Sequence, residues 1–180
     1  KLYLTFLISF LVSYFFMPVL RGLATRFNIL DLPNYRKMHK VATPLLGGMG
    51  IDLGLAAGVL LNLNKLFIFL PVLLGATLIL ILGLIDDIKR LNVQTRLLCQ
   101  ALIALFVIAL GLRVNFLPLG WWKDIGEITI TLFWIIGVTN AYNYLDGMNG
   151  LATGSAVINL FCLWSILNST KQYALELMVI

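Results

Sequence analysis

Six apolar runs of 13 to 20 residues, separated by short polar segments, constrain this chain more than any other feature. A transmembrane helix needs about 20 mostly apolar residues to cross a hydrocarbon core of roughly 30 Å. The runs therefore predict an all-α fold, a polytopic transmembrane bundle of about six spans in one membrane domain over residues 1–180. A further apolar stretch near Ala174 predicts the start of a seventh span. The six runs are 2–20, 45–63, 66–85, 97–112, 128–140 and 151–167.

The composition excludes the soluble and the disordered classes. Hydrophobic residues make up 61% of the chain and charged residues only 12%, whereas an average soluble domain has about 45–50% and about 25%. A soluble exterior needs polar cover, and disordered chains are poor in apolar residues. The net charge of +5 is modest, so we expect no nucleic-acid partner.

The fifth run is short, and its helix is expected to start earlier, near Trp121 and Trp122, whose rings suit the headgroup zone.

Basic residues gather on one side of the predicted bundle. Because consecutive spans cross in opposite directions, residues 21–44, 86–96 and 141–150 should share one face. The positive-inside rule makes this face cytoplasmic, and four acids and the only histidine, His39, lie in the same segments. We therefore expect a multi-pass protein with its chemistry on the cytoplasmic side. Eight of the 13 lysines and arginines lie there: Arg21, Arg26, Arg36, Lys37, Lys40, Lys89, Arg90 and Arg96.

The first polar cluster runs from Asp31 to Lys40 and is followed by the glycines Gly47, Gly48 and Gly50. Basic side chains beside the cytoplasmic leaflet attract phosphate, whether on a lipid or on a ligand. The glycines permit close backbone approach by a neighbouring helix or a substrate. A purely structural interpretation explains the same residues. The basic side chains would anchor the loop on the cytoplasmic side of the membrane, and the glycines would let the second helix pack against a neighbour. Asp52, about one turn into the second run, has either a functional role or an interfacial hydrogen bond.

The second cluster holds two adjacent acids, Asp86 and Asp87, at the cytoplasmic end of the third run, with Arg90 and Arg96 nearby. Adjacent carboxylates repel each other unless a cation or a shared proton offsets their charge. A hard cation such as Mg²⁺ binds carboxylate oxygens and keeps substrate phosphates among its ligands, and arginines can clamp the same phosphates. A solvated helix end with ordinary ion pairs is the alternative.

The third cluster places Asn140, Asn143 and Asp146 at three-residue spacing between two apolar runs, with Asn149 following. If the helix continues through Asp146, these side chains share one face, and Gly150 allows a break before the sixth span. Side-chain amides both donate and accept hydrogen bonds. They can therefore recognise the hydrogen-bonding edge of a nucleobase, or supply an oxygen ligand to a bound metal ion. Without such a partner the cluster would be expensive at a membrane edge.

Together, the three clusters resemble the polyprenyl-phosphate N-acetylhexosamine-1-phosphate transferase family, in particular its bacterial undecaprenyl-phosphate GlcNAc-1-phosphate branch. They occur in the order and spacing of that family. The matching positions are Asp31, Pro33, Arg36, Lys37, His39, Thr43, Pro44, Gly47 and Gly48, then Gly83, Asp86, Asp87 and Gln100, then Phe133, Trp134, Ile135, Gly137, Thr139, Asn140, Ala141, Asn143, Asp146, Gly147, Gly150, Leu151 and Ala152.

The resemblance implies an enzyme that transfers GlcNAc-1-phosphate from a UDP-sugar, UDP-GlcNAc, to undecaprenyl phosphate and releases UMP. It implies the first membrane step of cell-envelope polysaccharide synthesis in the bacterial plasma (inner) membrane, with Mg²⁺, or Mn²⁺ in its place, as cofactor. A homodimer stays open. The implied roles are catalysis for Asp86 and Asp87, metal binding for Asp86, Asp87 and Asn143, and substrate binding for Arg36, His39, Arg96, Asn140, Asp146 and Asn149.

Some positions depart from the family pattern, and three other functions stay open. Asn149 stands where many bacterial members carry Asp, Arg90 where some carry an acid, and Gln94 where many carry a base. A later metal-binding aspartate of the family has no counterpart before Ile180, so we expect this stretch alone to be an incomplete, C-terminally truncated part that does not turn over. The alternatives are a phospho-MurNAc-pentapeptide transferase, a non-catalytic nucleotide-sugar-binding protein, and a transporter. The gathering of polar groups at one face argues against the transporter.

Overall fold

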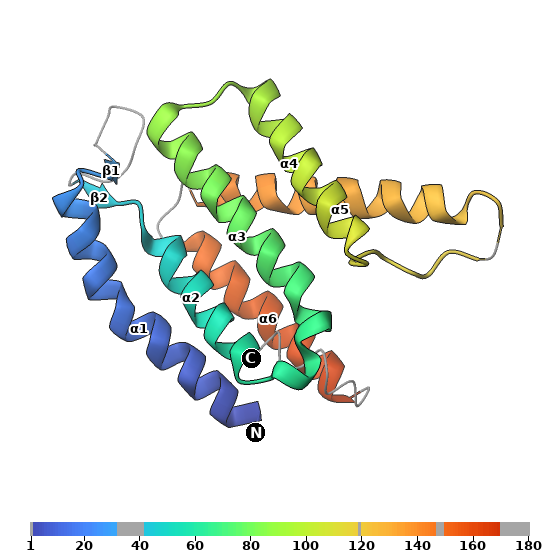
Figure 1. The fold of residues 1–180 in the computed structure, drawn as a ribbon, viewed down its shortest axis with the longest axis horizontal. Coiled ribbons are helices and arrows are strands. Elements are labelled where there is room, and N and C mark those ends of the chain that lie inside the picture. The colour runs from blue at the N-terminus through green and yellow to red at the C-terminus, as the bar shows by residue number, and fades with distance from the viewer. Residues whose placement is uncertain (1, 32–41, 119, 147–149, 170–180) are drawn as a thin grey trace.

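The structure, a computed structural model, describes residues 2–31, 42–118, 120–146 and 150–169. These ranges form six α-helices, a short 3-10 helix and one pair of two-residue strands (Figure 1). The predicted all-α bundle is confirmed, and the strand pair is an addition to it. In chain order the elements are α1 (Leu2–Arg26), β1 (Leu30–Asp31), β2 (Thr43–Pro44), α2 (Gly47–Leu60), η1 (Leu63–Lys65), α3 (Leu66–Lys89), α4 (Val93–Ala109), α5 (Lys123–Leu145) and α6 (Leu151–Ser169).

The strand pair has a local cause. Thr43 precedes Pro44, and a residue before proline is pushed toward the extended backbone that a strand needs. β1 and β2 run antiparallel, with Leu30 opposite Pro44 and Asp31 opposite Thr43. The pair ties the end of α1 to the start of α2.

Each of the six apolar runs forms a helix. Four helical segments are long and apolar enough to cross a membrane: 3–26, 63–89, 123–145 and 151–169. α2 and α4 are apolar but shorter, because α2 gives way to a turn and η1 after Leu60. α5 begins at Lys123, directly after Trp122, which confirms the earlier start predicted for the fifth helix. The seventh span predicted near Ala174 lies outside the described residues.

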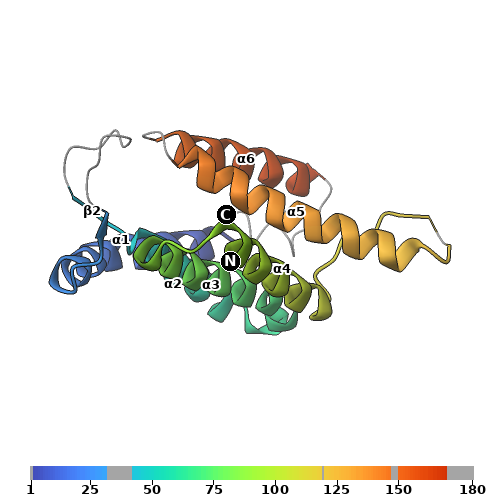
Figure 2. The same ribbon diagram turned by 90° about the horizontal axis from the view of Figure 1, so that it is seen from above.

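The helices form two layers. Along the chain, α1 packs on α2, α2 on α3 and α3 on α4, and Figure 2 shows α5 and α6 in a separate layer above them. The strand pair, the end of α3 and the start of α4 lie at one end of the first layer, and η1 lies at the other (Figure 1). The described parts of the first two polar segments therefore meet at one end, as their predicted common face requires.

Small residues bring α1 and α2 close together. Gly50, Gly54 and Gly58 recur every four residues on α2 and face α1. A Cβ added at Gly54 would lie 2.9 Å from the backbone oxygen of Ser9, and one added at Gly58 would lie 2.8 Å from the Ser9 hydroxyl oxygen. Small residues at this spacing allow membrane helices to approach closely. The close helix approach predicted for the glycines of the second span is confirmed at Gly50, where a Cβ would lie 3.0 Å from Met17 Cε.

Gly54→Ala is expected to lower the free energy of unfolding by about 1–3 kcal/mol, the usual range for overpacking. The contact is with backbone, which cannot turn aside as a flexible side chain can. The matched control is Gly22→Ala on α1, where nothing lies within 4 Å of an added Cβ. Alanine is the better helix former, so the control should unfold at or above the original temperature. Thermal unfolding in detergent measures both variants, and equal behaviour would contradict the packing described here.

Asp52 joins α2 to α3 inside the apolar part of the bundle. The Thr77 hydroxyl lies 3.0 Å and 3.2 Å from the two carboxylate oxygens of Asp52, and 2.9 Å from the carbonyl oxygen of Leu73. A polar contact between two helices satisfies groups that would otherwise be costly in hydrocarbon. Of the two roles left open by the sequence, the contacts agree with the structural one.

A set of charged side chains holds the segment after α4 against the start of α5. Arg113 Nη1 lies 2.9 Å from a carboxylate oxygen of Asp124, and Arg113 Nε lies 3.9 Å from Glu127. Lys123 Nζ lies 3.9 Å from the other oxygen of Glu127. The Glu127 side chain is 0% exposed, and neither of its oxygens accepts a hydrogen bond from the described residues. The burial of this carboxylate is thus compensated by the two nearby cations rather than by hydrogen bonds.

Candidate functional site

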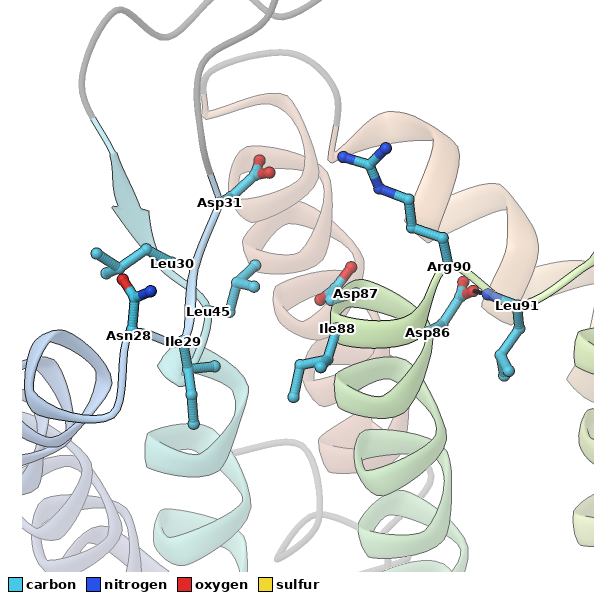
Figure 3. A pocket seen from close by; sticks show the side chains of 10 residues that line it. All are labelled: Asn28, Ile29, Leu30, Asp31, Leu45, Asp86, Asp87, Ile88, Arg90 and Leu91. Atoms are coloured by element: carbon cyan, nitrogen blue, oxygen red, sulfur yellow. Dashed lines mark hydrogen bonds between the residues drawn. The ribbon is translucent and has the colours of Figure 1, made fainter.

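A cavity of about 440 Å³ opens where β1 approaches the end of α3. Three carboxylates, those of Asp31, Asp86 and Asp87, line it together with the guanidinium-bearing Arg90. Figure 3 shows the Asp86 side chain turned toward Leu91, while Asp87 stands on the side of the cavity that faces Asp31. The remaining lining residues are Asn28, Ile29, Leu30, Leu45, Ile88 and Leu91. The cavity therefore brings Asp31, the first residue of the first polar cluster, beside the second cluster.

The backbone at the end of α3 explains why the two adjacent acids point in different directions. Arg90 takes a left-handed conformation, with φ of 52°, and stops the helix. Asn28, on the opposite wall, is also left-handed, with φ of 57°. The Arg90 N–H donates to the Asp86 carbonyl over 2.7 Å, and the next N–H, that of Leu91, donates to Asp86 Oδ1 over 2.9 Å. The side chain of Asp86 thus closes the last turn of its own helix.

The second oxygen of Asp86 is held by α4. Arg96 Nη1 donates to Asp86 Oδ2 over 3.2 Å, and the two side chains are 29% and 18% exposed. Asp86 is therefore engaged on both oxygens, and Asp87, which lines the same cavity, is the more exposed of the two acids. Arg96, predicted to bind substrate, lies against this acid, and its buried Nε has no hydrogen-bond partner in the described part of the chain. Both acids of the predicted catalytic pair line the cavity, and Asp86 is the one whose two oxygens are held by Leu91 and Arg96.

The position of Arg96 depends on how α4 begins. Asn92 caps the helix: its side-chain oxygen accepts from the Thr95 N–H over 2.7 Å. Asn92→Ala removes this bond and is expected to cost about 1 kcal/mol of stability. Asn92→Asp keeps the accepting oxygen and should unfold like the unchanged protein. Thermal unfolding compares the two, and a similar loss in both variants would count against the cap.

On α4, one turn beyond Arg96, the buried Gln100 is paired with Asn140 of α5. Asn140 Nδ2 donates to Gln100 Oε1 over 2.7 Å and to the Ile136 carbonyl over 2.8 Å. A backbone carbonyl can only accept, so it fixes Nδ2 on that side and leaves Asn140 Oδ1 as the atom open to a ligand. If this predicted substrate-binding residue touches a ligand, it therefore does so as an acceptor. Through Arg96 and Gln100, α4 contacts both the acid pair and the third cluster.

Two further residues of the third cluster, Asn143 and Asp146, are not among those that line the cavity. α5 continues to Leu145 with Asp146 as its right-handed C-cap, which confirms the helix predicted through this cluster. Asn143 and Asp146 are exposed and do not line the acid cavity. Gly150, with φ of 76°, marks the predicted break before α6. The described residues thus do not bring Asn143 together with Asp86 and Asp87.

Three of the predicted substrate-binding residues, Arg36, His39 and Asn149, lie outside the described residues. Conversely, Asp31 was not among the predicted site residues, although the structure places it in the wall of the acid cavity. Its position at the start of the first polar cluster, on the same predicted face as Asp86 and Asp87, was the available signal.

The cavity offers oxygen donors of the type that Mg²⁺ prefers. Among the described residues, no three His, Cys, Asp or Glu side chains lie close enough together to hold a metal ion by themselves. Mg²⁺ sites in proteins usually use one or two carboxylates and take further ligands from water and substrate phosphates. The donor chemistry of Asp31 and Asp87 fits a site of that kind.

Three known proteins that are similar in sequence to this chain are named as transferases that act on a polyprenyl phosphate. The chain is 31% identical over 166 residues to a Bacillus subtilis protein named probable undecaprenyl-phosphate N-acetylglucosaminyl 1-phosphate transferase, covering 89% of this chain and 46% of that protein. It is 31% identical over 175 residues to an undecaprenyl-phosphate alpha-N-acetylglucosaminyl 1-phosphate transferase of Yersinia pestis, covering 93% and 48%. A decaprenyl-phosphate N-acetylglucosaminephosphotransferase of Mycolicibacterium smegmatis is 30% identical over 184 residues, covering 92% and 45%.

The chain spans about half the length of these curated relatives. No solved structure matches it. Residues 69–180, more than half of the chain, match the sequence model of Glycosyl transferase family 4. This stretch includes the acid pair, Arg96, Gln100 and the whole third cluster. On this match, and with its apolar helices and acid-lined cavity, the chain belongs to Glycosyl transferase family 4.

Proposed function

We propose that the protein transfers GlcNAc-1-phosphate from UDP-GlcNAc to a polyprenyl phosphate, undecaprenyl phosphate in the first instance, and releases UMP. The observation that carries the proposal is the cavity in which Asp31, Asp86 and Asp87 meet beside Arg90. The names of the relatives support the acceptor lipid and the transferred sugar. We place the protein in the bacterial plasma membrane, with this cavity at the cytoplasmic ends of α1 and α3.

In the proposed reaction, an oxygen of the lipid phosphate attacks the β-phosphorus of the UDP-sugar. The bond between that phosphorus and the UMP oxygen breaks, and a lipid-linked pyrophosphate forms. Phosphoryl transfer depends mainly on positioning and on stabilisation of spread negative charge. Bound Mg²⁺ would supply the charge neutralisation on the pyrophosphate.

The residues of this chain have separate tasks in the proposal. Asp87 is exposed at the cavity. Its carboxylate takes the proton of the lipid phosphate or would bind the metal ion. The ion pair between Asp86 and Arg96 holds the end of α3 against the start of α4. Arg90 offers a guanidinium to phosphate oxygens. Asn140 presents an accepting oxygen to the N–H or O–H of a ligand.

The test is UMP release by the full-length protein, reconstituted with undecaprenyl phosphate and UDP-GlcNAc, with and without Mg²⁺. We expect release that requires both the lipid and the cation, and that Mn²⁺ partly restores after chelation. UDP-MurNAc-pentapeptide, added as a competing donor, distinguishes the related phospho-MurNAc-pentapeptide transferase. Nucleotide binding without any UMP release would overturn the proposal in favour of a binding protein.

A further inference from the structure

A second cavity, of about 250 Å³, lies beside α1 on the other side of the segment that leads into α2. It shares no lining residue with the acid cavity. Pro44 and Leu46 line it, whereas Leu45 between them lines the acid cavity. The segment is therefore a wall with one cavity on each side. The full lining is Met17, Leu20, Arg21, Pro44, Leu46 and Gly47.

The lining of this second cavity is apolar except for one cationic side chain. Five of the six residues are apolar or glycine, and the sixth is Arg21. Arg21 is exposed and has no carboxylate partner among the described residues. At Gly47, nothing lies within 4 Å of the position that a Cβ would occupy, so the cavity is open at this residue. A positive charge beside an apolar hollow complements a ligand that has an anionic head and an apolar tail.

The depth of Arg21 in the membrane points to the source of such a ligand. Arg21 is the first charged residue after the apolar stretch 2–20 of α1. At 1.5 Å per residue this stretch is about 28 Å long, close to the roughly 30 Å of a hydrocarbon core. The Arg21 guanidinium therefore lies at the level where lipid headgroup phosphates begin. A guanidinium can bind two phosphate oxygens at once.

We infer that this cavity binds an anionic phospholipid of the bilayer, with the lipid phosphate on Arg21 and the first part of an acyl chain against Met17, Leu20 and Leu46. The wall 44–46 separates the bound phosphate from Asp31 and Asp87. The occupant is thus a resident lipid and not the phosphate that reacts. The binding of a phospholipid at Arg21 does not depend on the proposed enzymatic activity.

The experiment compares lipid retention by the full-length protein in nanodiscs that contain phosphatidylglycerol and phosphatidylcholine. Native mass spectrometry counts the lipids that stay bound after release from the disc. We expect the unchanged protein to retain phosphatidylglycerol preferentially. Arg21→Gln should reduce that retention about five- to tenfold, which corresponds to roughly 1 kcal/mol for one arginine near a charged surface.

Two matched controls make the result specific. Arg26→Gln removes the same charge from an exposed residue of the same helix end that does not line the cavity, and it should keep phosphatidylglycerol. Gly47→Leu fills the cavity without removing charge and should lose the lipid, whereas Gly154→Leu, also with open space at its Cβ position, should retain it. Thermal unfolding confirms that all four variants are folded.

Three results would overturn the inference. The first is an equal loss in Arg21→Gln and Arg26→Gln, which would reduce the effect to general surface charge. The second is full retention in Gly47→Leu. The third is displacement of phosphatidylglycerol by undecaprenyl phosphate at equal concentration, which would assign the cavity to the lipid substrate instead.

Discussion

Asp87→Asn, introduced into the full-length protein, is expected to lower the rate of UMP release at least about 100-fold, the usual range for losing a catalytic acid–base or charge-stabilising group. The carboxylate of Asp87 is exposed at the cavity that Asp31 also lines, where it can contact a phosphate or its cation. The amide of asparagine has a similar shape but cannot carry the charge or take a proton. Because Asp87 is exposed, solvent weakens the contacts of its carboxylate, and the free energy of unfolding should change by less than about 1 kcal/mol. Initial rates and thermal unfolding of the same preparation measure both effects.

Asp86→Asn serves as the contrasting variant. Its oxygens accept from the Leu91 N–H and from Arg96, so this change should lower both the rate and the stability, the latter by about 1–3 kcal/mol. An Asp86–Arg96 double-mutant cycle isolates the contact between the two residues. If Asp86→Asn loses activity with unchanged stability while Asp87→Asn stays active, the roles assigned to the two acids are reversed.

Arg113→Ala is expected to destabilise the protein by about 3–5 kcal/mol, the cost typical of removing one partner from a buried charge. Glu127 is 0% exposed, and its nearest cations are Arg113 and Lys123, each at 3.9 Å. Without Arg113, one of the two charges that offset the burial of this carboxylate is lost. The same substitution frees Asp124, but that side chain is 72% exposed and water can solvate it. Chemical or thermal unfolding in detergent gives the measurement.

The opposite change, Glu127→Gln, should be much milder, within about 1 kcal/mol. It removes the buried negative charge and keeps the shape of the side chain. Arg113 is 40% exposed and still pairs with Asp124 at 2.9 Å. Removing the cation should therefore cost more than removing the anion. Equal losses in the two variants would mean that Glu127 is more hydrated than its burial indicates.

The sequence was sufficient for the helices because membrane spans depend on local composition. The apolar runs 66–85 and 151–167 correspond closely to α3 and α6, and the Trp121–Trp122 pair correctly indicated an earlier start for α5. The strand pair was not predicted, since it joins residues that are 12 or more positions apart. Its formation depends on the meeting of two segments, which hydrophobic periodicity does not report.

The site could be predicted only in part, for reasons visible at particular residues. The spacing of Asp86 and Asp87 shows that two carboxylates are adjacent. It does not show that the Leu91 N–H and Arg96 engage one of them. Similarly, the sequence predicts Asn140 as a substrate-binding residue, but it does not show that Asn140 donates a hydrogen bond to Gln100, 40 residues away. Asp31 enters the cavity only through the pairing of β1 with β2.

The left-handed backbone at Arg90 has a consequence for anyone who engineers this protein. A non-glycine residue in this conformation costs roughly 1–2 kcal/mol, and glycine would take it without that penalty. A screen for thermal tolerance should therefore favour Arg90→Gly, and with it the loss of a guanidinium from the wall of the acid cavity. Asn28, on the opposite wall, presents the same choice in milder form, because asparagine tolerates this conformation better. At Arg90, selection for heat resistance and selection for turnover should therefore favour different residues.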